Sequence, residues 1–182
     1  MIDSTKKQRF QASVLPHLNS AFNLACWLTR SHQDAEDVVQ EAYLRAFKFF
    51  DSFHGDDSRA WLLTIVRNTF YTWYQEQQKQ RQQTVFDEDV HTSQTGDRFG
   101  MAYADNNPEA LLMQKDSERL LQHALQALPL EFREVMVMRE LEELSYKQIA
   151  AIVGIPIGTV MSRLGRGRKL LATILAPARQ EA

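Results

Sequence analysis

The sequence predicts an all-α protein with two small helical domains joined by a flexible linker, the C-terminal domain ending in a helix-turn-helix. Apolar residues recur at spacings of three and four in both halves of the chain, which is the periodicity of amphipathic helices. This periodicity is missing from residues 77–108, where Gln, Asp, Asn, Thr and Gly dominate. Two short helical patterns separated by a tight turn follow Ser145. We therefore expect domains at residues 1–76 and 109–182, with the linker between them.

Composition excludes several classes of protein. The chain has 182 residues and a formal net charge of −2, and it contains no apolar run approaching the roughly 20 residues that span a bilayer. Its first residues lack the apolar core of a signal peptide, so we expect a cytoplasmic protein without direct membrane insertion. Cys26 is the only cysteine and the histidines are scattered. We expect no disulfide, no metal site and no cofactor.

A strongly acidic amphipathic helix is predicted over residues 34–50. Its first turn is crowded with carboxylates, where the helix dipole favours negative charge, and the polar side continues beyond that turn. From the residues alone, two interpretations stay open: a solvated face, which is the simpler one, or a docking face for a basic helical partner. The residues of this polar side are Asp34, Glu36, Asp37, Gln40 and Glu41.

A polar loop over residues 51–58 leads into a long helix that carries both aromatic and basic side chains. We assign Trp61 and Trp73 to the core, while Tyr71 and Tyr74 stay open between the core and the surface. Aromatic and basic side chains interleaved on one exposed face suit single-stranded DNA, because bases stack on the rings while cations follow the backbone.

The helix-turn-helix is predicted from capping and turn residues. Ser145 and Gln148 have the spacing of a capping box, Gly154 suits the left-handed end of the first helix, and Pro156 begins the second. At about 100° per residue, the second helix divides into two faces. The predicted core face contains Ile157, Val160, Met161 and Leu164, and the predicted outward face contains Thr159, Ser162, Arg163 and Arg166.

The outward face has the chemistry of a DNA-reading helix. Hydroxyls and guanidiniums bind phosphates and base edges, and the second helix of such a motif enters the major groove. No acidic residue occurs between Glu143 and Glu181, so this part of the chain is locally basic. The alternative is a surface helical hairpin with solvated arginines.

A family resemblance is carried by three segments that occur in a fixed order: DAEDVVQEAYLRAFKFF at 34–50, RAWLLTIVRN at 59–68, and LPLEFREVMVMRELEELSYKQIAAIVGIPIGTVMSRLGRGRKLL at 128–171. Together they resemble an extracytoplasmic-function sigma factor over nearly the whole chain apart from the linker. The resemblance implies a dissociable specificity subunit of bacterial RNA polymerase, with no catalytic activity and no small-molecule substrate.

The resemblance also implies partners and sites. The partners are core RNA polymerase (the β′ clamp helices and the β subunit), promoter DNA and an anti-sigma factor. The acidic side of the 34–50 helix would bind the clamp helices, and the linker would thread through polymerase channels. Residues implied for opening the −10 element are Phe53, His54, Arg67, Asn68 and Tyr71. Residues implied for the −35 element are Lys147, Thr159, Ser162, Arg163, Arg166, Arg168 and Lys169.

Some positions depart from the family pattern. Met161 stands where a polar or basic residue is common, and we expect no polar base contact from it. Gly165 and Gly167 replace larger residues, so we expect that end of the helix to fray. The competing hypothesis is a free-standing helix-turn-helix regulator, which would bind a palindromic operator tightly by itself.

Overall fold

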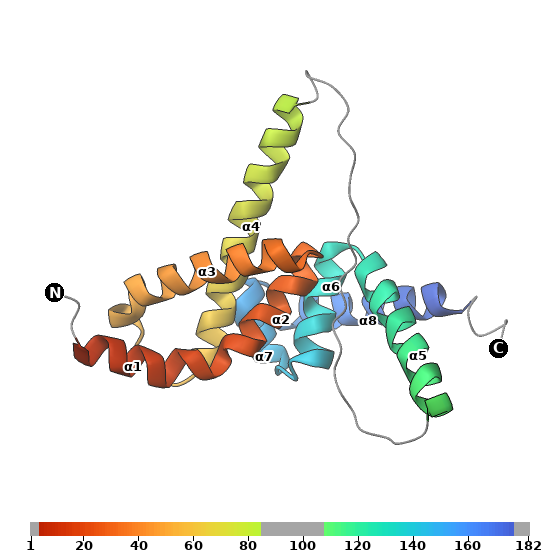
Figure 1. The fold of residues 1–182 in the computed structure, drawn as a ribbon, viewed down its shortest axis with the longest axis horizontal. Helices are drawn as coiled ribbons and strands as arrows, with labels where there is room; N and C mark the ends of the chain where they lie inside the picture. Colours follow the sequence, from red (N-terminus) through yellow and green to blue (C-terminus); the bar gives the residue numbers. More distant parts are fainter. Residues whose placement is uncertain (1–3, 85–107, 177–182) are drawn as a thin grey trace.

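The computed structural model describes residues 4–84 and 108–176, and within these ranges it contains helices and no strand (Figure 1). The all-α prediction is confirmed. The N-terminal unit contains α1 (Ser4–Val14), α2 (Leu18–Thr29), α3 (His32–Phe49) and α4 (Ser58–Thr84). The C-terminal unit contains α5 (Pro108–Ala127), α6 (Leu130–Met136), the π-helical turn η3 (Val137–Leu141), α7 (Tyr146–Val153) and α8 (Ile157–Leu175).

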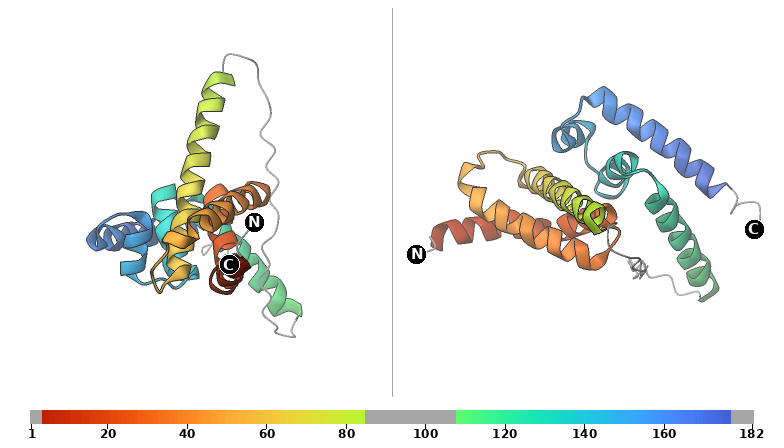
Figure 2. Two further views of the ribbon diagram at one scale, coloured as in Figure 1. Left: turned by 90° about the vertical axis from the view of Figure 1, so that its left-hand side faces the viewer. Right: turned by 90° about the horizontal axis from the view of Figure 1, so that it is seen from above.

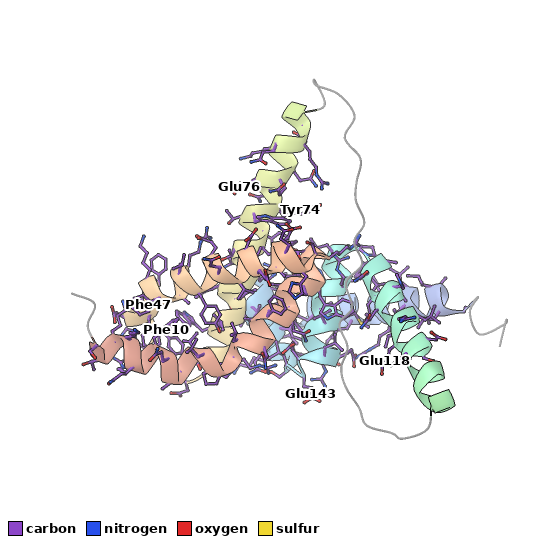
Figure 3. The ribbon with its side chains drawn as sticks, viewed as in Figure 1. Phe10, Phe47, Tyr74, Glu76, Glu118 and Glu143 are labelled. Carbon is purple, nitrogen blue, oxygen red and sulfur yellow. The ribbon has the colours of Figure 1, made fainter. Side chains whose placement is uncertain are left out.

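The core of the N-terminal unit lies where α2, α3 and α4 pack together. Leu24, Val38 and Leu62 are at most 1% exposed, and burial of each such side chain stabilises the fold by about 1.5–3 kcal/mol. Phe10 of α1 packs edge-on against Phe47 of α3 with ring centroids 5.2 Å apart, and the two rings lie close together in Figure 3. This aromatic cluster attaches α1 to the end of α3.

Local capping explains where α2 ends and where α3 and α4 begin. Arg30 adopts a left-handed conformation (φ 60°) that ends α2, and the Ser31 hydroxyl then caps α3 by accepting from the Asp34 amide at 3.3 Å. The Asp57 carboxylate accepts from the Ala60 amide at 2.9 Å at the start of α4. This hydrogen bond, together with one from Gln148, lowers the pKa of Asp57. α4 thereby begins directly after the loop that contains Phe53.

The long helix predicted after residue 58 is α4, and it extends past the predicted start of the linker at residue 77. It continues to Thr84, eight residues beyond the predicted domain boundary at residue 76, because nothing in the Gln-rich segment after Glu76 breaks a helix. Its C-terminal half, with Tyr74 and Glu76, projects away from the other helices (Figure 3). The rest of the predicted linker, residues 85–107, lies outside the described residues.

The predicted helix-turn-helix is confirmed in α7 and α8. The Gln148 amide donates to the Ser145 hydroxyl at 3.1 Å, and the Ser145 amide donates to Gln148 Oε1 at 2.8 Å, which completes the capping box. Gly154 ends α7 with φ 74°, a conformation in which a side chain would cost about 1–2 kcal/mol. The axes of α7 and α8 differ by 101°, as expected for this motif.

The predicted core face of α8 is only partly correct. Val160 and Leu164 are buried, but Ile157 is 46% exposed and Met161 is 56% exposed. The buried side of α8 is a narrow stripe that continues to Gly167, because the short helices α6 and α7 cover less of it than the angular analysis assumed. Met161 therefore lies on the accessible side of the recognition helix.

Gly165 and Gly167 do not end α8, which continues through them to Leu175. Gly167 is buried, and a Cβ there would lie 3.0 Å from Met136 Cγ and 3.3 Å from Met136 Sδ. Gly165 has no comparable neighbour within 4 Å. The glycine at 167 therefore permits a close approach of α8 to α6.

Alanine substitutions at these two glycines are expected to act in opposite directions. Gly165→Ala should raise the free energy of unfolding by roughly 0.5–1 kcal/mol, since alanine is the better helix former. Gly167→Ala should lower it by about 1–3 kcal/mol through overpacking against Met136. Urea unfolding followed by circular dichroism would measure both, and equal stabilisation by the two variants would contradict the packing assigned to Gly167.

The two units pack against one another along α4 and α2. Contacts join α4 to α7 and α2 to α6, and two further views show α6 and α7 beside the N-terminal helices (Figure 2). We call this packing the closed arrangement. No single helix within residues 4–84 and 108–176 is long and apolar enough to cross a membrane, and α7 and α8 pass that test only as a pair, across their bend.

Candidate nucleic-acid and polymerase interfaces

The polar side of α3 is accessible along two of its turns. Asp37, Gln40 and Glu41 are exposed, and Glu41 forms an i,i+4 ion pair with Arg45 at 2.7 Å. Leu44 follows Asp37 by seven residues, which is about two helical turns, and is 62% exposed. An exposed apolar side chain therefore lies on the same side of α3 as the carboxylates. We refer to Asp37, Gln40, Glu41 and Leu44 as the α3 face.

The other two residues predicted for polymerase binding lie at the edges of the α3 face. Asp34 is half-buried beside the Ser31 cap. Glu36 lines the edge of a pocket between α2 and α3, and its carboxylate lies 3.4 Å from Nδ1 of His32, one turn earlier on α3. The sequence analysis missed Leu44, although its position outside the apolar stripe of α3 was the available signal.

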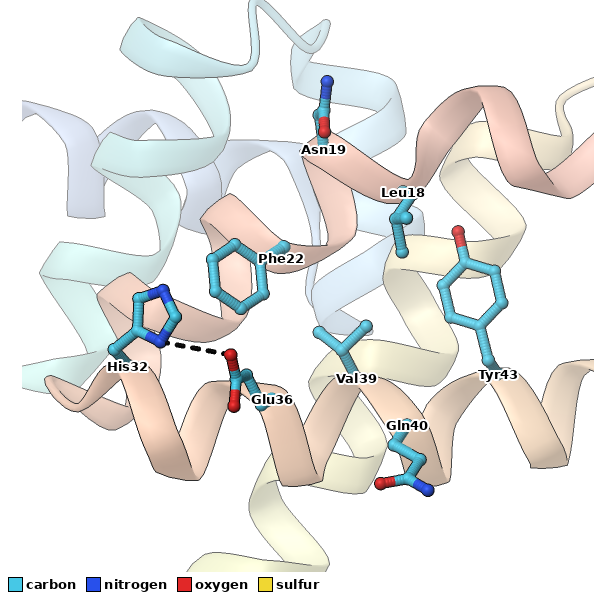
Figure 4. A pocket seen from close by; sticks show the side chains of 8 residues that line it. All are labelled: Leu18, Asn19, Phe22, His32, Glu36, Val39, Gln40 and Tyr43. Atoms are coloured by element: carbon cyan, nitrogen blue, oxygen red, sulfur yellow. Dashed lines mark ion pairs between the residues drawn. The ribbon is translucent and has the colours of Figure 1, made fainter. Parts of the chain in front are cut away.

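A cavity of about 540 Å³ opens between α2 and α3 beside this face. Figure 4 shows Leu18, Phe22 and Val39 on its apolar side, and Glu36 and Gln40 at its polar edge. Leu18 is 44% exposed. The α3 face is therefore continuous with an apolar hollow, a combination that suits a protein partner better than a solvated surface.

The loop before α4 presents an aromatic platform. Phe53 stacks on Trp61 with ring centroids 4.7 Å apart and an interplanar angle of 30°. His54 is exposed and its Nδ1 lies 2.8 Å from the Ser52 carbonyl oxygen. Asn68 is exposed. It follows Trp61 by seven residues, so the two positions differ by only about 20° around the axis of α4. Phe53, Trp61 and Asn68 thus share one side of the N-terminal unit.

Arg67 and Tyr71 point elsewhere, so the structure does not bring the predicted −10 residues together as one set. Arg67 is about 100° from Asn68 around α4, and its guanidinium donates two hydrogen bonds to Glu134 of α6, at 2.8 and 3.1 Å. The Tyr71 hydroxyl donates to the same carboxylate at 3.2 Å. The C-terminal unit therefore covers this part of the predicted site.

The Glu134 carboxylate and burial together shift the pKa values of Arg67 and Tyr71. Burial and the negative charge of Glu134 raise the pKa of Tyr71 to about 12. Burial alone would lower the pKa of Arg67, but the hydrogen bonds and charge of Glu134 raise it above its usual value. The Arg67 side chain also lies over the Tyr71 ring, 4.4 Å from its centroid. Both groups therefore stay in their donor forms at neutral pH.

The basic residues of the C-terminal unit differ in accessibility. The exposed members of the predicted −35 set are Lys147, Ser162, Arg166, Arg168 and Lys169. Arg168 is nevertheless paired with Glu140 at 2.7 Å. Thr159 is half-buried, and the Arg163 side chain is only 23% exposed because it lies between Glu131 and Glu134, at 3.7 and 3.5 Å.

Two groups of candidate residues therefore emerge from the geometry. The α3 face and its hollow suit a protein, whereas the Phe53 platform and the exposed side of α8 suit nucleic acid. Within the parts of the chain that the structure describes, no three His, Cys, Asp or Glu side chains are grouped as they would be around a metal ion.

In comparisons with known proteins, one family model matches each helical unit. The Sigma-70 region 2 family matches residues 14–80, and the Sigma-70 region 4 family matches residues 118–171. The ECF RNA polymerase sigma-E factor of Escherichia coli is 34% identical over 145 residues, which are 79% of this chain and 75% of that protein. The ECF RNA polymerase sigma factor SigE of Mycolicibacterium smegmatis is 33% identical over 163 residues, which are 90% of this chain and 60% of that protein.

Solved structures show the same fold. The sigma factor RpoE of Bartonella quintana, in a complex with the anti-sigma factor NepR, superimposes with a TM-score of 0.73 and 28% identity, covering 93% of this chain and 98% of that one. CnrH, in a complex with the cytosolic domain of CnrY, gives a TM-score of 0.62 at 22% identity, covering 94% of this chain and 90% of that one.

A helix-turn-helix unit matching region 4, attached to a helical unit matching region 2, defines an alternative sigma factor of bacterial RNA polymerase. The chain belongs to the extracytoplasmic-function sigma factor family. It directs transcription initiation by binding core polymerase and promoter DNA, and the hypothesis of a free-standing regulator is not favoured.

Proposed function

We propose that the three surfaces described above divide the work of initiation. The α3 face and the adjoining hollow bind the clamp helices of β′, the Phe53 platform captures an unstacked base of the −10 element, and the exposed side of α8 reads the −35 element. The observation that carries this proposal is the exposure of Leu44 among carboxylates, 62% accessible on a helix whose other apolar residues are mostly covered. An acidic face that also presents an exposed apolar side chain fits a basic amphipathic helix.

Capture of a base by the platform requires no nucleotide hydrolysis. Unstacking one base costs a few kcal/mol, and stacking of a base on an aromatic ring is worth about 1–3 kcal/mol. Phe53 and Trp61 form a preorganised stack, and the exposed Asn68 amide supplies a donor and an acceptor for a base edge. The protein thus acts by binding and positioning, without catalysis of its own.

The −35 assignment is revised by the exposure of α8. Ser162, Arg166 and Lys169 are accessible in the closed arrangement, and we add Met161, whose apolar side chain suits the methyl group of thymine. Thr159 is half-buried, and Arg163 reaches a major groove only if it leaves Glu131 and Glu134 of α6. Arg168 reaches DNA only if it leaves Glu140.

Asn68→Ala is expected to impair strand opening while leaving duplex binding intact. Loss of hydrogen bonds to an unstacked base should cost about 1–3 kcal/mol, which lowers the open-complex population by roughly 5- to 150-fold. Because the side chain is exposed, folding should be unaffected. Permanganate reactivity of −10 thymines in the holoenzyme would measure opening, and gel mobility on ice would measure the closed complex.

The neighbouring exposed Thr72, one turn further along α4, supplies the control Thr72→Ala. Normal permanganate reactivity in the Asn68 variant would remove Asn68 from the base-capturing site.

We also propose that an anti-sigma factor regulates this chain. The support is the similarity to the Bartonella quintana sigma factor, whose structure contains NepR. Reconstituted transcription should then be inhibited by a cognate protein that buries part of the α3 face. Retention of full transcription activity in its stoichiometric complex would contradict this.

A further inference from the structure

Two apolar side chains of the recognition helix are accessible to solvent instead of lying in the core. Ile157 is 46% exposed and Met161 is 56% exposed. Neither belongs to the buried core or to the partly buried apolar residues that pack against it. Because residues i and i+4 are neighbours on the surface of a helix, these two side chains form one small apolar patch. We refer to Ile157 and Met161 as the apolar pair.

The apolar pair lies at the end of α8 that faces bases in a helix-turn-helix. Ile157 is the first residue of α8, and the N-terminal residues of a recognition helix contact base edges in the major groove. Ser162 is exposed directly after Met161, about 100° further around the axis. The first two turns of α8 therefore present an apolar group and a hydrogen-bonding group side by side.

Two glycines beside the apolar pair leave the outermost side of α8 without bulky side chains. A Cβ at Gly158 or at Gly165 would meet no atom within 4 Å. These two positions and Ser162 lie within about 60° of one another around the axis, and Met161 lies about 40° from Gly165. The helix backbone can therefore approach the bases closely, which brings the apolar pair within reach of the groove floor.

The charges around the apolar pair favour nucleic acid as its partner. Lys147, Arg166 and Lys169 are exposed, and α8 contains no acidic residue. The carboxylate of Glu140, on the preceding turn η3, is paired with Arg168 at 2.7 Å. In the major groove, the apolar group of a base pair is the C5 methyl of thymine. Apolar side chains surrounded by cations thus match thymine methyl groups that lie between two phosphate backbones.

We propose that Ile157 and Met161 read the C5 methyl groups of two thymines in the −35 element. Positions four residues apart on a helix are separated by about 6 Å along its axis, and successive base pairs by about 3.4 Å. The two thymines are therefore expected within about two base-pair steps of each other. This inference rests on the proposed role of α8 in reading the −35 element, and it adds the chemistry by which part of that sequence is selected.

The test replaces each thymine of a −35 element in turn by deoxyuridine, which lacks only the C5 methyl group. The probe is a −35 element from templates that the holoenzyme transcribes, and competition binding with the holoenzyme measures affinity. Each methyl group that is read should contribute about fourfold, the factor that corresponds to burial of one methyl-sized group. Two thymines within about two base-pair steps should show this loss, and thymines in the flanking DNA should not.

Alanine variants identify which side chain contacts which methyl group. Ile157→Ala and Met161→Ala should each lose the response to deoxyuridine at one position and keep it at the other. Both side chains are exposed, so folding should not depend on them. The matched control is Ile174→Ala, which truncates an apolar side chain that is 38% exposed near the other end of α8 and should keep both responses.

The outcomes separate this inference from the proposed function. If the holoenzyme prefers the element over a scrambled sequence but binds the thymine and deoxyuridine forms equally, the proposed function survives and the methyl readout is overturned. Responses that persist at both positions in both alanine variants would also overturn it, because other residues would then read the methyl groups. If the holoenzyme shows no preference for the element over scrambled DNA, the −35 role of α8 fails and the methyl readout fails with it.

Discussion

Charge reversal at Asp37 is expected to weaken binding of core RNA polymerase by at least about a hundredfold. Asp37 is exposed at the N-terminal end of the α3 face, so Asp37→Lys should not disturb the core of the N-terminal unit. Placing like charges opposite one another at an interface costs several kcal/mol, and each 1.4 kcal/mol corresponds to about tenfold in affinity. Fluorescence anisotropy of labelled protein titrated with core polymerase would measure the loss.

The matched control for Asp37→Lys is Glu76→Lys. Glu76 is an exposed carboxylate on the projecting half of α4 (Figure 3), so its reversal changes net charge equally outside the α3 face. Only the Asp37 variant should lose polymerase affinity. Unchanged affinity in that variant would return the acidic side of α3 to the simpler interpretation, a solvated helix face.

Arg163→Ala is expected to reduce −35 affinity of the holoenzyme by about 1–3 kcal/mol, or roughly 5- to 150-fold, if its guanidinium reads a base. The measurement belongs in the holoenzyme, because the protein directs initiation together with core polymerase. A guanine contact would additionally relax selectivity at one base pair. Competition binding with single-base variants of the −35 element would reveal both effects.

The control for Arg163→Ala is Arg119→Ala, which removes an equal charge from an exposed position on α5. A uniform loss across all DNA sequences would place Arg163 on a phosphate. Full affinity and selectivity in the Arg163 variant would remove it from the DNA interface.

Local features of the fold were predictable because they depend on neighbours in sequence. The capping box of Ser145 and Gln148 and the left-handed Gly154 follow from residues within one turn. The acidic side of α3 was likewise predictable from the helical spacing of its apolar and charged residues. The predicted core face of α8 failed at Ile157 and Met161, since periodicity gives the direction of a face but not how widely other helices cover it.

The contacts between the two units were not predictable from sequence. Glu134 lies 67 residues from Arg67 along the chain, in a segment where periodicity gives no reason to pair them. Its burial among apolar neighbours in α6 was a weak signal, because a charged residue inside such a run needs a partner. The identity of that partner depends on tertiary packing. The predicted −10 set therefore divided into an exposed platform and a covered pair.

In vitro transcription on a promoter library, with and without core polymerase, tests whether this chain works as a specificity subunit of the polymerase. We expect the protein alone to give no transcript and to bind DNA weakly, whereas with core polymerase it selects templates that share one −35 and one −10 element. Tight binding of a palindromic site by the protein alone, with no change in promoter choice when core polymerase is added, would contradict it.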